Sequence, residues 1–106
     1  MATAYLREYA DLAVTAGAKQ AQCGAEPALA DQTITTSGTT AASNAFNANT
    51  RLIAISTPAA QAVACLFSAT PGATPTALVT SLRLPANSLF FFGVRPGDKV
   101  ALIDVT

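Results

Sequence analysis

Apolar and polar residues alternate in short stretches along most of the chain, and turn signals separate these stretches. The clearest example is stopped by Pro58, and another ends at Ser37-Gly38. Strands at intervals of about 8–12 residues are typical of a β-sandwich or a barrel. The pattern therefore predicts an all-β fold, a small antiparallel sandwich, with strands over residues 32–36, 50–57 and 62–67.

The last third of the chain carries two further apolar stretches, residues 88–94 and 99–105. Between them stands Arg95-Pro96-Gly97-Asp98, with proline and glycine at the second and third positions that a type II turn requires. We predict a β-hairpin here, with both of its faces covered because both strands are almost continuously apolar. One face of this hairpin should complete a core that includes Ile53, Ile55 and Phe67.

The first thirty residues differ from the rest because Gly17, Gly24 and Pro27 interrupt any regular element. We interpret residues 1–30 as an N-terminal arm that docks on another surface, and residues 31–106 as the sandwich domain. A helix within residues 4–22 also fits the spacing. So does a short strand over residues 5–9 that belongs to the sandwich, with both of its tyrosines and Arg7 on one face.

Charge and composition narrow the classes of function. Charged residues make up only 11% of the chain, and six Lys and Arg balance six Asp and Glu. A chain without a basic field is a poor nucleic-acid binder. Its longest apolar run, residues 89–94, is too short to span a membrane. So few charges on a small domain favour a closed assembly, and we expect a homo-oligomer, a trimer or a dimer.

Catalytic chemistry has little support in the sequence. Histidine is absent, so no imidazole can activate a nucleophile or bind a metal. Cys23 and Cys65 stand far apart and lack the spacing of a zinc site. We expect both to be buried thiols rather than a disulfide. The prediction is therefore no enzyme, no catalytic residue, no cofactor and no metal site.

Several segments carry a resemblance in their order and spacing: Gln32-Thr33-Ile34, residues 43–55, Leu84-Pro85-Ala86-Asn87-Ser88, and residues 91–103. Together they resemble small head-decoration, or cement, proteins of tailed bacteriophages. The resemblance covers roughly residues 27–104. It implies a jelly-roll-like sandwich made in the bacterial host cytoplasm and carried on the virion, on the capsid surface. Its partner there would be the major capsid protein.

Two other functions remain open at this stage. One is a virion-associated recognition module that binds host glycans, for which residues 90–92 with Asn87 are the candidate cluster. The other is a different minor head or tail structural protein. Three consecutive aromatics cannot enter one core, so either Phe91 or its two neighbours face outward. The candidate partner contacts are Tyr5, Leu6, Tyr9, Leu12, Arg51, Phe90, Phe92 and Arg95.

Overall fold

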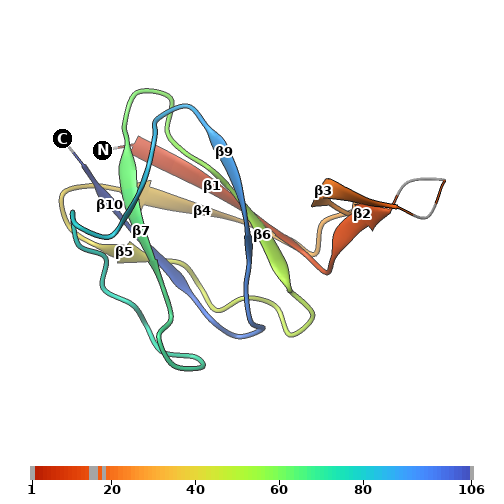
Figure 1. Cartoon of the computed structure of the whole chain (residues 1–106). Helices are drawn as coiled ribbons and strands as arrows, with labels where there is room; N and C mark the ends of the chain where they lie inside the picture. The colour runs from red at the N-terminus through yellow and green to blue at the C-terminus, as the bar shows by residue number, and fades with distance from the viewer. Residues whose placement is uncertain (1, 15–16, 18, 106) are drawn as a thin grey trace.

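The computed structural model describes residues 2–14, 17 and 19–105. Two four-stranded antiparallel sheets pack face to face, and a two-stranded hairpin extends from one end (Figure 1). Sheet I has the order β4-β1-β6-β9, with strands Ala30–Thr36, Ala2–Tyr9, Leu52–Ser56 and Leu89–Gly93. Sheet II has the order β5-β10-β7-β8, with strands Ala41–Ala42, Val100–Asp104, Val63–Phe67 and Leu82–Leu84. The hairpin consists of β2 (Leu12–Val14) and β3 (Gln20–Gly24). The prediction of an all-β fold is confirmed.

The core lies between the two sheets because alternate side chains of each strand point inward. Ile53 and Ile55 of β6 face Val63 and Cys65 of β7 across it, and all four are buried. Phe67 is partly buried and packs against this cluster, with its ring centroid 5.1 Å from that of Phe92. The predicted core residues therefore lie in the core.

Strand β1 corrects the interpretation of residues 1–30 as an arm. It lies inside sheet I, paired with β4 on one side and with β6 on the other. Ala4 and Leu6 point into the core and are only 1% and 2% exposed. A strand that supplies buried side chains and two ladders of hydrogen bonds belongs to the domain, as the alternative interpretation of residues 5–9 held.

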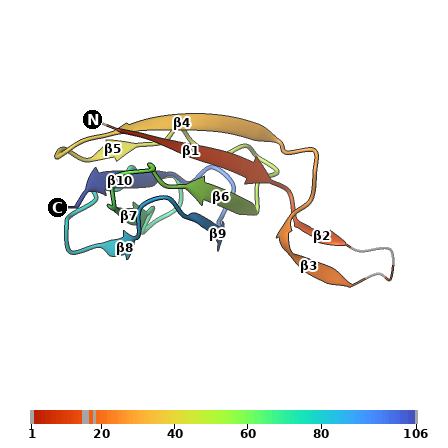
Figure 2. The same ribbon diagram turned by 90° about the horizontal axis from the view of Figure 1, so that it is seen from above.

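Only the hairpin leaves the sandwich in the described part of the chain, as Figures 1 and 2 both show. Two residues separate it from β1, and at its base the backbone N–H of Ala25 donates to the carbonyl of Asp11 at 3.0 Å. Residues 15, 16 and 18 of this region lie outside the described residues. Within the segment predicted to be an arm, the hairpin is the part that extends away from the sandwich.

The predicted hairpin over residues 88–105 is wrong, although both of its strands exist. Strand β9 pairs with β6 in sheet I, whereas β10 lies between β5 and β7 in sheet II. The intervening turn has the expected geometry, with Gly97 at φ 81°, but it joins the two sheets. Other segments bind the backbone that follows the turn: Ser43 donates to the Val100 carbonyl at 2.7 Å, and Ser68 donates to that of Lys99 at 3.1 Å.

The two sheets differ in what covers their outer faces. On sheet II, Ala64 and Ala101 point away from the core and yet are completely buried. The connection between β7 and β8 reaches across part of this face, although Leu66 opposite Ala101 is still 42% exposed. The Ala77 N–H of this connection reaches the hydroxyl of Thr40, beside β5 at the far edge of the sheet, at 2.9 Å. On sheet I, by contrast, Tyr5 and Leu89 are each 59% exposed on the outer face.

A buried carboxylate fastens β1 to a distant loop. Glu8 is 2% exposed and accepts hydrogen bonds from the Asn47 N–H and the Thr50 hydroxyl, both at 2.7 Å. Its second oxygen accepts from Nε2 of Gln32 at 2.9 Å. These donors give the buried carboxyl oxygens the hydrogen bonds that water would otherwise make.

Candidate binding groove

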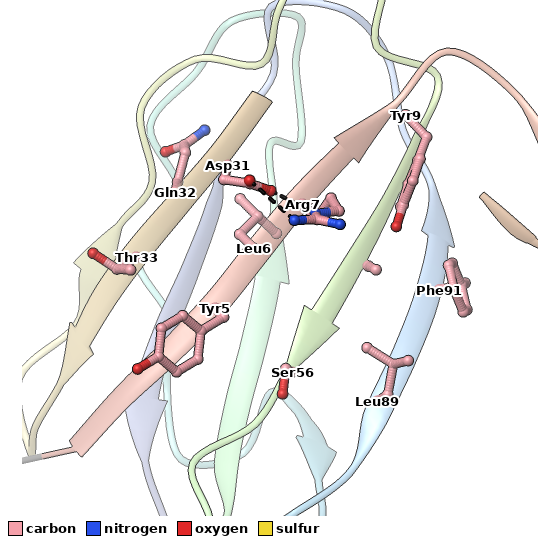
Figure 3. A pocket seen from close by; sticks show the side chains of 11 residues that line it. Tyr5, Leu6, Arg7, Tyr9, Asp31, Gln32, Thr33, Ser56, Leu89 and Phe91 are labelled. Atoms are coloured by element: carbon pink, nitrogen blue, oxygen red, sulfur yellow. Dashed lines mark hydrogen bonds and ion pairs between the residues drawn. The ribbon is translucent and has the colours of Figure 1, made fainter. Parts of the chain in front are cut away.

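A shallow groove of about 560 Å³ lies on the uncovered outer face of sheet I (Figure 3). Its floor is Ala54 and Ser56 of the interior strand β6. Leu89 and Phe91 of β9 stand along one side. Side chains of β1 and β4 stand along the other: Tyr5, Arg7, Tyr9, Asp31 and Thr33.

The strand register creates this hollow. Arg7 lies opposite Ala54, which lies opposite Phe91, and in the next row Tyr5, Ser56 and Leu89 follow one another in the same way. Two small residues on the middle strand therefore stand between rows of long side chains. Because alternate residues share a face, each row consists only of outward-pointing positions.

An ion pair forms the polar part of the groove. The Arg7 guanidinium donates to both carboxylate oxygens of Asp31, at 2.7 and 3.2 Å, and lies 3.5 Å from the carboxylate of Glu26. The hydrogen bond to Asp31 is the main reason that the pKa of Arg7 is raised. About half of the Arg7 side chain remains exposed, so the pair keeps free donors and acceptors toward solvent.

Tyr9 closes one end of the groove and connects it to the hairpin. Its hydroxyl donates to Glu26 at 2.9 Å, and its ring centroid lies 6.3 Å from that of Phe91. Burial, followed by the hydrogen bond to Glu26, raises the pKa of Tyr9 above its ordinary value. The ring also lies directly against Gly24 at the end of β3.

The structure divides the predicted contact residues. Tyr5 and Tyr9 both line the groove, on the face that they share with Arg7. Leu6, Phe90 and Phe92 point inward instead, Leu6 as a buried core residue and the two phenylalanines packed against the core. Since β9 alternates, Phe91 is the aromatic that faces outward, so the proposed cluster of residues 90–92 with Asn87 is replaced by Phe91 alone.

The remaining predicted contacts lie elsewhere. Leu12 is half-buried in the hairpin. Arg51 and Arg95 are exposed beside a second depression of about 380 Å³. There Arg95 binds Asp98 at 2.6 Å and the Ser68 carbonyl at 3.0 Å. Arg51 and Arg95 thus lie together, apart from the groove.

Sequence reasoning missed Asp31, Ser56 and Phe91 as groove residues. The alternation within each stretch gives the face of each residue, but not which strand lies beside which. The pairing of β6 with both β1 and β9 is what places these side chains together. Within the described residues, no group of three or more His, Cys, Asp or Glu side chains could hold a metal ion.

In that same part of the chain, no helix is long and apolar enough to cross a membrane. Comparisons with protein-family models, with curated proteins and with solved structures gave no match for this chain.

Proposed function

We propose that this chain is a structural virion protein, a decoration or cement protein that binds the outer surface of a phage head. In this role it stabilises neighbouring copies of the major capsid protein. The observation that carries the proposal is the β2–β3 hairpin, which projects from an otherwise closed sandwich. The resemblance in sequence supports the same role. We include in this proposal that the sandwich is a jelly-roll-like one and that the protein resides on the virion surface.

The hairpin has the properties of a docking element. A two-stranded ribbon is marginally stable in water, so an isolated one gains from a partner surface. Val14 on β2 is 63% exposed, and at the base of the hairpin Leu29 is 38% exposed. Apolar side chains on a projecting ribbon offer area to be buried against a capsid subunit, and the ribbon edges offer backbone groups for strand addition.

A second apolar surface supports contact with more than one neighbour. Leu78, Val79 and Leu82 around the turn before β8 are 57–60% exposed. This segment belongs to sheet II, whereas the hairpin continues from a strand of sheet I. With zero net charge, the molecule has little electrostatic repulsion to keep copies apart. Simultaneous contacts with a capsid subunit and a second copy, in a dimer or trimer, would give the avidity that a cement protein needs.

A head-binding assay tests the proposal. Heads are prepared from the phage that encodes the chain, with this gene deleted, and incubated with purified protein. Bound protein is measured after sedimentation through a density gradient. We expect saturable binding in many copies per head and greater resistance of the heads to heat.

Two variants locate the contact. Replacement of residues 12–24 by a short Gly-Ser linker, and the milder Val14→Lys, should both abolish binding while the β spectrum is kept. The matched control Thr35→Lys adds the same charge at an exposed position of β4 and should bind normally. Absence of the natural protein from heads would overturn the proposal. Full binding by both hairpin variants would overturn the hairpin as the contact.

A further inference from the structure

We propose that the groove on sheet I binds a neutral carbohydrate chain of hexopyranose units. Its volume, about 560 Å³, lies within the usual range for small-molecule sites, roughly 300–1,000 Å³. The proposal goes beyond attachment to a capsid and does not depend on it, because the groove is separate from the projecting part of the hairpin. It rests on the apolar surfaces, on the polar groups and on the strands that form the floor.

The apolar surfaces suit the faces of sugar rings. Tyr5 is 59% exposed, and Figure 3 shows its ring face-on beside the floor strand. Phe91 and Leu89 provide apolar surface on the opposite side of the floor. The face of an aromatic ring carries partial negative charge and attracts the weakly positive C–H groups of a pyranose. The small side chains of Ala54 and Ser56 leave the space in which such a ring can lie.

The polar groups suit hydroxyls, each of which donates and accepts at once. The Asp31 carboxylate has four acceptor positions, of which Arg7 uses two, and the guanidinium has N–H groups that do not point at Asp31. Adjacent hydroxyls of a sugar can therefore donate to Asp31 and accept from Arg7. The hydroxyls of Thr33 and Ser56 extend this polar surface along the groove.

The charges at the groove favour a neutral ligand. Arg7 is the only cation among the lining residues, and it is shared between Asp31 and Glu26. An anionic chain would meet the Asp31 carboxylate in the groove, the Glu26 carboxylate beside Arg7, and an arginine that is already paired. A cationic chain would have to compete with Arg7 for those carboxylates. An uncharged chain neither is repelled by the carboxylates nor has to compete with Arg7 for them.

The floor of the groove argues against an extended peptide. Peptides that bind sheets usually add a strand at an edge, where backbone N–H and C=O groups are free. Strand β6 is interior, and its backbone is paired with β1 on one side and β9 on the other. A symmetric pairing in which the hollow of one copy faced the hollow of the other would leave both unfilled. Side-chain recognition of a hydroxylated chain avoids both difficulties.

Titration with defined oligosaccharides tests the proposal. The probes are maltohexaose, cellohexaose, chitohexaose and mannohexaose, with an acidic hyaluronan hexasaccharide for comparison, and binding is followed by calorimetry and by the shift in Tm. At least one neutral probe should bind and raise Tm, and it should bind more tightly than the acidic one. Tyr5→Ala should weaken that binding roughly tenfold through lost stacking, whereas Tyr5→Phe should retain it.

Matched variants assign the site. Asp31→Asn should weaken binding through loss of acceptors, and Leu66→Ala, at an exposed apolar position of sheet II outside the groove, should leave it unchanged. Tm values of the free variants check that all are folded. The proposal is overturned if no neutral probe binds, if the acidic probe alone binds, or if Tyr5→Ala binds as well as the natural protein. Self-association that Tyr5→Ala abolishes would assign the face to a second copy instead.

Discussion

Gly24 lies against the ring of Tyr9 so closely that a β-carbon at position 24 would overlap the ring atoms. The same ring forms the end of the groove and hydrogen-bonds Glu26, close behind the hairpin. Tyr9 therefore fixes the hairpin to the sandwich and shapes the groove at the same time. A change at the base of the hairpin should be felt in the groove.

Gly24→Ala tests this relationship. The added methyl group must displace the Tyr9 ring, so we expect a loss of stability of about 1–3 kcal/mol, the usual cost of overpacking. Gly38→Ala is the matched control, because nothing lies within 4 Å of a β-carbon there. Thermal unfolding of the two variants should show a lower Tm for the first only. Equal Tm values would mean that the ring is free to move aside.

Glu8→Gln tests the buried carboxylate. The new amide group would point its N–H donors at Nε2 of Gln32, itself a donor, and that contact would be lost. We expect destabilisation of about 1–3 kcal/mol, measured by urea unfolding, because a buried polar group is left unsatisfied.

The double variant Glu8→Gln with Gln32→Glu restores the match of donors and acceptors. The new amide at position 8 would accept from Asn47 and Thr50 through its oxygen and donate to the new carboxylate at position 32. The other oxygen of that carboxylate would accept from the Asn44 N–H, which binds Gln32 at 2.9 Å in the natural protein. The double variant should therefore be more stable than Glu8→Gln alone. Additive losses from the two substitutions would show that the two side chains are not coupled.

The pH dependence of stability should carry a contribution from Asp98. The Gly72 N–H at 2.9 Å, aided by Arg95, holds the pKa of this buried carboxylate below its ordinary value. Its contribution is therefore complete above the unfolded pKa, about 3.9, and is lost as the pH falls through the lower folded pKa. The Tm difference between the natural protein and Asp98→Asn should be constant at neutral pH and should shrink below about pH 4. A difference that persists unchanged to about pH 2 would contradict this.

The two thiols should react very differently. Both thiols are free, as expected. We also expected both to be buried, but only Cys65 is; Cys23 is exposed on the hairpin. Burial raises the pKa of Cys65 to about 11, so almost no thiolate forms near neutral pH. A disulfide reagent such as Ellman's reagent should modify one thiol per native chain and two after unfolding. Cys23→Ser should remove the fast reaction, whereas fast reaction of that variant would refute the assignment.

Deletion of residues 2–9 should prevent folding, whereas replacement of residues 12–24 by a linker should not. The first change removes an interior strand that supplies Ala4 and Leu6 to the core, and the second removes a ribbon outside both sheets. Circular dichroism and urea unfolding distinguish the two results. A cooperative transition in the chain that lacks β1 would revive the interpretation of residues 1–30 as an independent arm.

The local pattern of the sequence was sufficient to find strands but not their neighbours. The stretches around Ile53 and Val63 were predicted because alternation and turn residues act over a few positions. Arg95-Pro96-Gly97-Asp98 also adopts its expected turn. The same turn chemistry serves a hairpin and a crossing between sheets, however, so contacts with Ser43 and Ser68 decide which one forms. Those contacts join residues far apart in the chain and leave no local signal.

For the same reason, only the β1 side of the groove could be predicted from the sequence. Alternation placed Tyr5, Arg7 and Tyr9 on one face if residues 5–9 form a strand, and that is where they lie. Ala54 and Phe91 join them only through the order of strands in sheet I. Phe90 and Phe92 were equally suited to face outward until β9 took its place at the edge of that sheet.

The position of β10 has a consequence for the order of events during synthesis. It is the last strand of the described chain, yet it lies in the interior of sheet II, where Ala101 pairs with both Ala42 and Leu66. As the chain emerges from the ribosome, β5 and β7 are made before β10, the strand that lies between them and pairs with both. The pairing of β10 with β5 and β7 joins residues far apart in the sequence, and such contacts form slowly, so we expect this pairing to be the rate-limiting step of folding. Until β10 has paired, the apolar inner faces of β6 and β7 are exposed and can contact other unfolded chains. Rapid production of the protein should therefore favour aggregation over folding.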